Sequence, residues 1–384
     1  MSAAAPLGLY VHVPYCSVRC SYCDFYLVPA AGRDLEGYVA ALCREIDAAG
    51  EAWGGRAADS VHFGGGTPSL LAPPLVGRIL AALSGTFRLA RDGEIALEAN
   101  PEDVRPDRLG ALRDLGVNRL TLGVQALDDR VLGLLRRPHG AAQALRAVEA
   151  ALTSGIRSIG VDLILGLPGQ ESREALAGIE RLAGTPGEGR RGIEHVSLYL
   201  LEIHPRTRLG REVALGRVAP MGDDAAAGLY EEAADLLESL GFEHYEISNF
   251  ARTGHRSRHN MKYWTDEEYL GFGPSAHSYA AGRRWSNAAD LRAYLESAGR
   301  AARQEDSQPA AGRAAEALFA GLRLAEGVDL GTLRGRYGEG LPGPSDPAVA
   351  GLLEAGLLVL SGPRLRLTRR GRLVSNEVFE RLLS

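Results

Sequence analysis

A regular alternation of short apolar segments and longer helical segments constrains the fold of this 384-residue chain more than any other feature. The apolar segments are expected to form six strands: Leu7–Val13, Ser60–Phe63, Glu94–Ala99, Arg119–Val124, Ser158–Leu165 and His195–Ile203. The segments between them have helical periodicity, for example Leu35–Ala49, Leu70–Leu83, Asp129–Ser154 and Asp224–Leu240. Repeated strand–helix units predict an α/β fold with a parallel sheet, either a partial (β/α) barrel or a doubly wound sheet.

Polar motifs follow the expected strands and favour the barrel. They are Cys16–Cys23, Gly64–Pro68, Glu98–Pro101, Gly123–Gln125 and Asp162, and each lies near or just past the carboxyl end of a strand. In parallel α/β folds this edge carries the functional site. We therefore expect one site at the mouth of a partial (β/α)6 TIM-like barrel.

The strand–helix alternation stops at about Gly312. Beyond it we expect helices over Ala314–Leu324, Pro347–Ala355 and Gly371–Leu383, and a short hairpin formed by Gly356–Ser361 and Arg364–Thr368. Helices with a small β-wing predict a smaller, winged-helix-like C-terminal domain. The expected division is a barrel domain over 1–215, an intermediate region over 216–312 and the C-terminal domain over 313–384.

The composition argues against several classes of protein. The net charge of −5 disfavours a nucleic-acid partner, since such a surface normally needs a basic excess. Met1–Leu7 lacks the basic and apolar regions of a secretory signal, and no apolar run is long enough for stable membrane insertion. The chain has four cysteines, three of them close together, which does not resemble a disulfide framework and indicates a reducing cytoplasm.

Cys16, Cys20 and Cys23 form a CxxxCxxC segment directly after the first expected strand. Three thiolates on one tight loop can bind three irons of a [4Fe–4S] cluster and leave the fourth iron open to a substrate or cofactor. The alternatives are a zinc site or three unrelated buried cysteines. Zinc usually takes four ligands and no second CxxC pair follows, so the spacing favours the iron–sulfur cluster.

This CxxxCxxC segment resembles the hallmark of the radical-SAM superfamily. The resemblance implies that S-adenosylmethionine chelates the open iron, and that an electron passed through the cluster splits this cofactor into methionine and a 5′-deoxyadenosyl radical. Further motifs are similar, in the same order, to those of the branch that contains the oxygen-independent coproporphyrinogen III oxidases: Tyr10–Pro14, Gly64–Pro68, Glu98–Pro101, Gly123–Gln125, Arg137–His139 and Asp162.

The likeness to this branch implies which residues bind S-adenosylmethionine. Gly65, Gly66 and Thr67 belong to the segment whose backbone would grip the methionine end, because glycines allow close approach. Glu98 would bind the ribose hydroxyls. The resemblance also implies contacts of Gln125, Arg137 and Asp162 with a second S-adenosylmethionine, and it places Tyr10 near the cluster.

The branch contains two kinds of member: the oxidase, which decarboxylates coproporphyrinogen III, and a heme chaperone, which binds heme and delivers it to apo-hemoproteins. Three features resemble the chaperone. Phe25 stands where the oxidase pattern has a further Cys, and the first strand begins at about Leu7, without the segment that precedes it in the oxidase. In addition, His259–Trp264 fits HNxxYW, the motif tied to heme binding in the chaperone.

The expected heme-binding residues are therefore His259, Asn260, Tyr263 and Trp264. An imidazole nitrogen can ligate heme iron, and the two aromatic side chains offer flat apolar faces to a porphyrin. His277 and His255 are rival ligands, and an axial Cys or Tyr stays open. We expect a heme chaperone, with homodimerisation possible and apo-hemoproteins as acceptors. The oxidase is the alternative, so whether the chain is an enzyme is left open.

Overall fold

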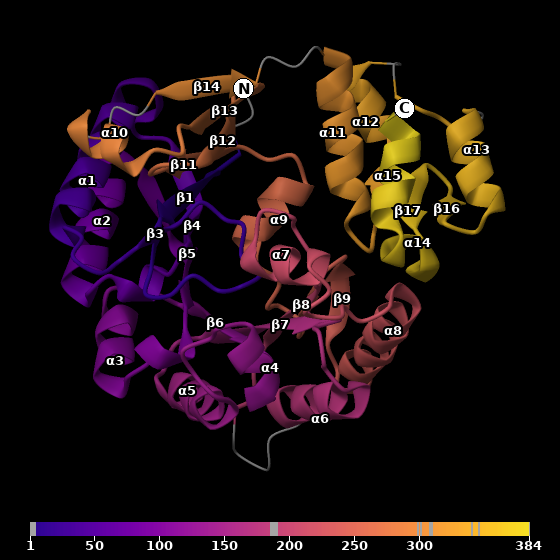
Figure 1. The fold of residues 1–384 in the computed structure, drawn as a ribbon. Coiled ribbons are helices and arrows are strands. Elements are labelled where there is room, and N and C mark those ends of the chain that lie inside the picture. The colour runs from indigo at the N-terminus through magenta and orange to yellow at the C-terminus, as the bar shows by residue number, and fades with distance from the viewer. Residues whose placement is uncertain are drawn as a thin grey trace.

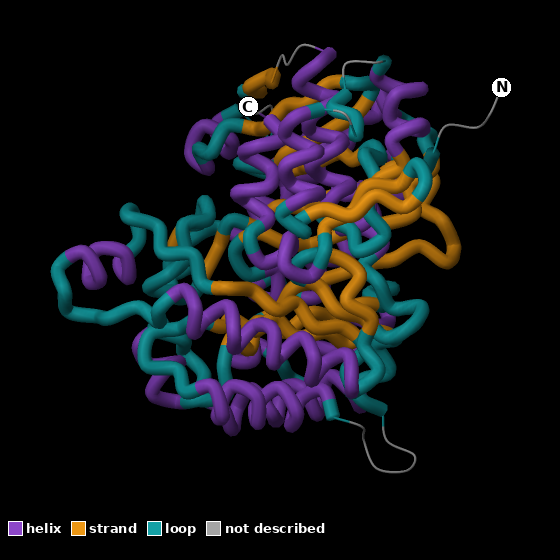
Figure 2. Tube along the Cα trace, turned by 90° about the vertical axis from the view of Figure 1, so that its right-hand side faces the viewer, coloured by secondary structure: helices purple, strands orange, loops and turns teal. Residues whose placement is uncertain are grey.

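The computed structural model describes residues 5–184, 191–297, 299, 302–306, 310–338, 341–344 and 346–383. Six parallel strands lie side by side in the order in which they follow one another along the chain (Figure 1): β1 (Leu7–Val13), β4 (Ala57–Gly65), β5 (Arg88–Ala99), β6 (Arg119–Gln125), β7 (Ser158–Leu165) and β8 (His195–Leu200). Helices pack along these strands (Figure 2), as they do when both faces of a parallel sheet are covered. The prediction of six βα units is confirmed.

The sheet continues past β1 and β8, and the barrel does not close. Beyond β1 it adds β11 (Tyr269–Phe272), which is parallel to β1, and then the antiparallel strands β12 (His277–Ala280), β13 (Arg283–Asn287) and β14 (Arg303–Asp306). Beyond β8 it adds β10 (Asn249–Ala251) and β9 (Glu243–Glu246). The α/β partial barrel is therefore confirmed, and the intermediate region extends the same twelve-stranded sheet.

The helices of the barrel part are α1 (Leu35–Trp53), α2 (Pro73–Thr86), α3 (Pro106–Asp114), α4 (Asp129–Leu134), α5 (Ala141–Thr153), α6 (Ser172–Ala183), α7 (Arg208–Ala214), α8 (Asp223–Ser239) and α10 (Leu291–Glu296). The expected single helix over Asp129–Ser154 is wrong, because α4 ends before α5 begins. Pro138 disfavours helical geometry at the residue before it, and Arg136 adopts a left-handed φ of 57°. This break brings Arg137 to the carboxyl edge of the sheet.

The C-terminal part packs around a hydrophobic core of its own, which includes Leu318, Leu352 and Val378. Its helices are α11 (Ala310–Leu322), α12 (Leu330–Tyr337), α13 (Pro347–Glu354), α14 (Arg369–Leu373) and α15 (Ser375–Leu383). The expected hairpin is present as β16 (Leu358–Ser361) and β17 (Arg364–Leu367), to which β15 (Val328–Asp329) adds a third strand. The expected last helix is two helices, α14 and α15. The division into 1–215, 216–312 and 313–384 stays a prediction.

One short helix packs against both parts. Helix α9 (Arg258–Trp264) contains the HNxxYW motif and lies at the centre of the molecule, against β1 and β4 on one side and α11 on the other (Figure 1). Within the described ranges, no helix combines the length and the apolar character needed to cross a membrane.

Candidate cofactor site

The cysteine loop is held by hydrogen bonds to neighbouring loops. The amide and hydroxyl of Ser21, in the middle of the loop, donate to the carbonyls of Leu135 and Leu134, both at 3.0 Å. The carbonyl of Ser21 accepts from the amide of Leu209, in the first turn of α7, at 2.7 Å. The loop is therefore fixed at the end of α4 and the start of α7, which sets the direction of the three cysteine side chains.

A single cavity brings together almost all the residues expected to hold the cluster and S-adenosylmethionine. It is open to solvent, and the space within it, part of which is continuous with solvent, amounts to about 730 Å³. The expected residues that line it are Cys16, Cys20, Cys23, Gly65, Gly66, Thr67, Glu98, Gln125, Arg137 and Asp162. Arg137 comes from the break between α4 and α5. The others come from the carboxyl ends of β4, β5, β6 and β7 and from the loop after β1, as the barrel prediction requires.

Tyr10 lies behind the cavity wall. A Cβ atom at Gly64 would lie 3.1 Å from the Tyr10 ring and 3.2 Å from Oε1 of Glu98, so the two side chains are neighbours across that glycine. The Tyr10 hydroxyl lies 3.1 Å from Nδ1 of His12. Tyr10 therefore lies close to Glu98, and it is not among the residues that line the cavity.

Two of the cysteines are joined by a chain of hydrogen bonds through the cavity wall. Thr67 Oγ1 donates to Cys16 Sγ at 3.2 Å and accepts from Asn100 Nδ2 at 3.3 Å. Arg137 donates to Asn100 Oδ1 at 2.7 Å and to Cys20 Sγ at 3.4 Å. Donors aimed at sulfur stabilise thiolate ligands. Asn100 is thus a site residue that the sequence reasoning missed, although it lies within the Glu98–Pro101 motif.

These residues fit an iron–sulfur cluster. Burial raises the pKa of Cys16 to about 11, so its free thiol holds a proton at neutral pH and loses it only when a metal takes its place. Three thiolates on one loop can bind three irons of a cubane, and the donors of Thr67 and Arg137 already lie against two of the sulfurs.

The glycine-rich segment after β4 has no room for side chains. Gly65 has φ of +108°, and a Cβ atom there would lie 2.8 Å from the His12 ring. A Cβ atom at Gly66 would lie 2.6 Å from the carbonyl oxygen of Tyr15. The bare backbone therefore approaches the cavity next to the cysteines, which fits binding of an amino acid such as the methionine end of S-adenosylmethionine.

Strain and an unpartnered donor also mark the cavity. Gln125 has φ of +68°, a left-handed conformation that a residue other than glycine adopts at a cost of about 1–3 kcal/mol and that is often found at binding sites. The Nε–H of Arg137 is buried without a hydrogen-bond partner among the described residues. A bound ligand would supply that partner.

The carboxylates of the cavity differ in their electrostatic surroundings. Burial and, to a smaller extent, the negative charge of Glu98 together raise the pKa of Asp162 to about 7, against a hydrogen bond from Ser197 that lowers it. Glu98 lies 2.9 Å from Nε2 of His62 and is partly exposed to the cavity. Asp162 is therefore suited to be neutral or charged at physiological pH, depending on what lies beside it.

The HNxxYW helix lies at the other end of the barrel interior. The His259 ring contacts Gly8 and Ser60, near the amino ends of β1 and β4, whereas the cysteines follow the carboxyl end of β1. The His259 side chain is completely buried. Its Nδ1 lies 3.1 Å from the Ser60 hydroxyl and its Nε2 lies 2.8 Å from the Tyr263 hydroxyl. Neither nitrogen is free to bind heme iron in this packing.

The other members of the motif are partly buried. Tyr263 packs edge-on against Tyr269, with ring centres 4.6 Å apart, and the Trp264 ring stacks with the Arg323 guanidinium at 4.4 Å. Asn260 lies on the half-exposed side of α9, and its backbone N–H donates to the Ser257 hydroxyl. Heme contact by these four residues stays a prediction, and it requires α9 to move away from β1 and β4.

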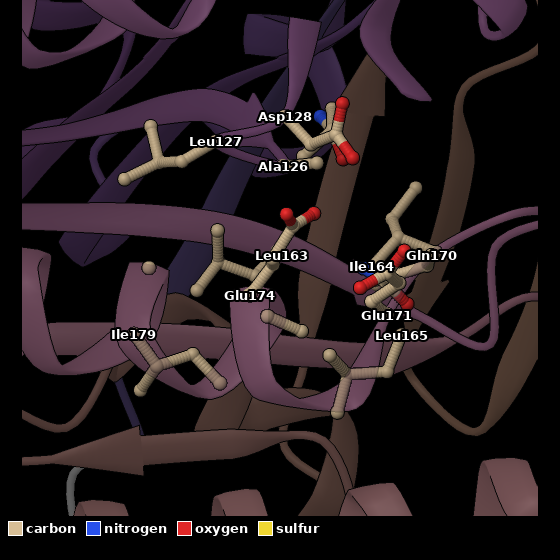
Figure 3. Close-up of a pocket in the computed structure, with 13 residues that line it drawn as sticks. Ala126, Leu127, Asp128, Leu163, Ile164, Leu165, Gln170, Glu171, Glu174 and Ile179 are labelled. Atoms are coloured by element: carbon tan, nitrogen blue, oxygen red, sulfur yellow. The ribbon is translucent and has the colours of Figure 1, made fainter. Parts of the chain in front are cut away.

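A second cavity lies next to the cofactor cavity, between β6, β7 and α6, and shares only Gln125 with it. Figure 3 shows the carboxylates of Asp128, Glu171 and Glu174 at its rim, above apolar side chains such as Ile179. It contains no cysteine and no basic side chain. This cavity therefore adds nothing to a site for iron, sulfur or an anionic ligand.

Comparison with known proteins agrees with this geometry. The model of the radical SAM superfamily matches residues 10–182, and that of the HemN C-terminal domain matches residues 309–374. A Mycobacterium tuberculosis protein called heme chaperone HemW is 35% identical, over 98% of this chain and 95% of its own length. The HemW protein of Bacillus subtilis is 32% identical, over 96% and 97%.

The solved structure of coproporphyrinogen III oxidase, HemN, from Escherichia coli superposes with a TM-score of 0.84. It covers 99% of this chain and 90% of the oxidase, at 22% sequence identity. The chain therefore has the fold of this radical SAM enzyme. At this identity the likeness concerns the fold and does not extend to the reaction.

Proposed function

Since the chain belongs to the HemW family of radical-SAM heme chaperones, we propose that it binds heme and delivers it to apo-hemoproteins in the reducing cytoplasm. The cofactor part of this proposal depends on one observation: the three cysteines line the same cavity as the residues expected to bind S-adenosylmethionine. None of the four cysteines takes part in a disulfide, which suits this compartment.

In this proposal Cys16, Cys20 and Cys23 hold three irons of a [4Fe–4S] cluster, which supplies one-electron chemistry and an open iron when it is bound. The backbone of Gly65 and Gly66 and the carboxylate of Glu98 orient S-adenosylmethionine at that iron. The remaining cavity residues that we assign to cofactor binding are Thr67, Gln125, Arg137 and Asp162, with Tyr10 behind them.

Heme transfer to an apo-hemoprotein tests the proposal. Cluster-reconstituted protein is loaded with heme under anaerobic conditions, separated from free heme, and mixed with an apo-hemoprotein whose absorbance spectrum changes on reconstitution. We expect the acceptor spectrum to develop faster than from an equal amount of heme bound to serum albumin. A rate no faster than that of the albumin control would contradict a chaperone function.

A second assay separates the chaperone from the oxidase. The same reconstituted protein is incubated with S-adenosylmethionine, a reductant and coproporphyrinogen III, and the porphyrins are separated by chromatography beside an active oxidase. We expect no conversion, since Phe25 stands where the oxidase pattern has a further Cys. Catalytic formation of protoporphyrinogen would assign the chain to the oxidases.

A further inference from the structure

An open cavity of about 1410 Å³ lies beside the cofactor cavity. Both are lined by Cys20, Cys23, Phe25 and Leu27, which belong to the cysteine loop and the residues directly after it (the cluster loop). Its walls carry five arginines and a single aspartate: Arg19, Arg136, Arg206, Arg208, Arg211 and Asp24. The whole chain has a net charge of −5, so this concentration of positive charge is local. A cavity with this balance attracts an anionic ligand.

Some of these arginines are already engaged. Asp24 lies 3.5 Å from Arg206 Nη2 and 3.7 Å from Nδ1 of His204. Arg19 and Arg211 donate to backbone carbonyls of the same region. Arg136 and Arg208, however, form no ion pair with any carboxylate of the described ranges, and both are exposed. Two guanidinium groups are thus free to bind carboxylates of a ligand.

The backbone position of one of these two arginines is fixed. Arg136 has φ of +57°, an unfavourable conformation for a residue with a side chain, and its neighbour Arg137 is bonded to Cys20, Asn100 and the Gly123 carbonyl. The position of the Arg136 Cα atom is therefore set by the anchoring of Arg137 in the cofactor cavity. This arrangement orients Arg136 without using its guanidinium group.

The remaining wall of the cavity is apolar and aromatic. Phe25 is 65% exposed, although side chains of its kind are usually buried, and Tyr26 and Leu27 follow it in the same wall. An exposed phenyl ring beside free arginines matches a ligand that is flat and apolar in its body and carries carboxylates at one edge. A phosphate or a small carboxylate would leave the ring uncovered.

We propose that this cavity is the docking site of heme, with Arg136 and Arg208 binding the two propionates and Phe25 packing on the porphyrin face. The inference rests on the proposed function, because heme is the cargo assigned there, and it adds the place where heme docks. It puts heme next to the cluster loop, and it leaves His259 in its buried contacts with Ser60 and Tyr263.

Heme titration of cluster-reconstituted protein tests this site. We expect the double variant Arg136→Ala, Arg208→Ala to bind heme about 10- to 100-fold more weakly, since two charge-assisted hydrogen-bonded pairs are lost. Alanine keeps a Cβ atom at Arg136 and so leaves the backbone preference there unchanged. The wild-type protein should bind heme dimethyl ester, which lacks the carboxylates, about as weakly as the double variant binds heme.

Two further variants serve as controls. Arg292→Ala removes an exposed arginine that pairs with Glu296 on α10, and it should leave heme affinity unchanged. Iron and labile-sulfide contents should be the same in all these proteins. Loss of the cluster in the double variant would instead assign these arginines to the cluster and overturn the docking site.

The remaining outcomes separate this inference from the proposed function. Unchanged heme affinity in the double variant, or equal affinity of the wild-type protein for heme and its dimethyl ester, overturns the docking site and leaves the chaperone function standing. If only His259→Ala binds heme more weakly, at an unchanged unfolding midpoint, the heme site is the HNxxYW motif and not this cavity. A wild-type protein that binds no heme overturns both proposals.

Discussion

The raised pKa of Asp162 predicts that this residue destabilises the cluster-free protein at alkaline pH. An aspartate ordinarily has a pKa of 3.8, and in this cavity the value is about 7. The folded state therefore favours the protonated carboxyl. Well below pH 4 Asp162 is protonated in both states and does not lower the stability. As the pH rises towards 7, the carboxyl ionises in the unfolded chain and stays protonated in the folded chain, so the free energy of unfolding falls.

The size of the effect follows from the two pKa values. At 1.36 kcal/mol for each pKa unit, the full penalty is at most about 4 kcal/mol, and about 2–3 kcal/mol of it develops between pH 5 and pH 8. Asp162→Asn keeps the shape and the neutral state of the protonated carboxyl. The variant should therefore gain about 2–3 kcal/mol relative to the wild-type protein when the pH is raised from 5 to 8.

Urea unfolding of both cluster-free proteins at the two pH values, under reducing conditions, measures this gain. Subtracting one protein from the other cancels the contribution of the titrating groups that do not interact with Asp162. Parallel pH profiles for the two proteins, or a variant that becomes relatively less stable at pH 8, would refute this reasoning. They would show that burial and the charge of Glu98 do not raise the pKa of Asp162.

Three further substitutions have defined outcomes. Cys20→Ala should abolish the brown absorbance of the reconstituted cluster, because two thiolates hold it poorly, and an unchanged iron and labile-sulfide content would exclude the cluster assignment. Gly65→Ala puts a side chain on a residue with a left-handed φ and 2.8 Å from the His12 ring, so the affinity for S-adenosylmethionine, measured by calorimetry, should fall at least tenfold. Unaltered affinity would contradict binding of the cofactor by this backbone segment. His259→Ala should lower the free energy of unfolding by about 2–4 kcal/mol, because it removes a fully buried ring that forms two hydrogen bonds. A change below about 1 kcal/mol would contradict that burial.

The parallel strands could be predicted because they are buried on both faces. The segments Leu7–Val13 and Ser158–Leu165 match β1 and β7 residue for residue, since continuous apolar, β-branched runs are typical of such strands. The break between α4 and α5 was missed because apolar periodicity continues on both sides of Pro138. Strand β11 has only four residues, too few for a periodic signal.

The cofactor site could be predicted as a set because its residues follow strand ends, and strand ends of a parallel sheet meet at one edge. The burial of His259 could not be predicted in this way. Its partners Ser60 and Glu94 lie 199 and 165 residues away in the sequence, and only the tertiary structure brings them to the motif. The arginine cavity was missed for the same reason, because its arginines come from three separate segments: the cysteine loop, the break between α4 and α5, and the start of α7 with the loop before it.

The position of α9 bears on how any experiment on the HNxxYW motif is interpreted. His259 stacks on His62 with ring centres 5.2 Å apart, and His62 lies within hydrogen-bond distance of Glu98 in the cofactor cavity. At the other end of α9, Trp264 stacks with Arg323, which pairs with Glu246 at 3.5 Å. A substitution in the motif therefore disturbs the cofactor cavity and the C-terminal part together. Because heme loading depends in our proposals on the neighbouring cluster loop, reduced heme binding in a motif variant is not by itself proof of ligation. Only a change in the spectrum of bound heme, at unchanged stability and unchanged cluster content, identifies an iron ligand.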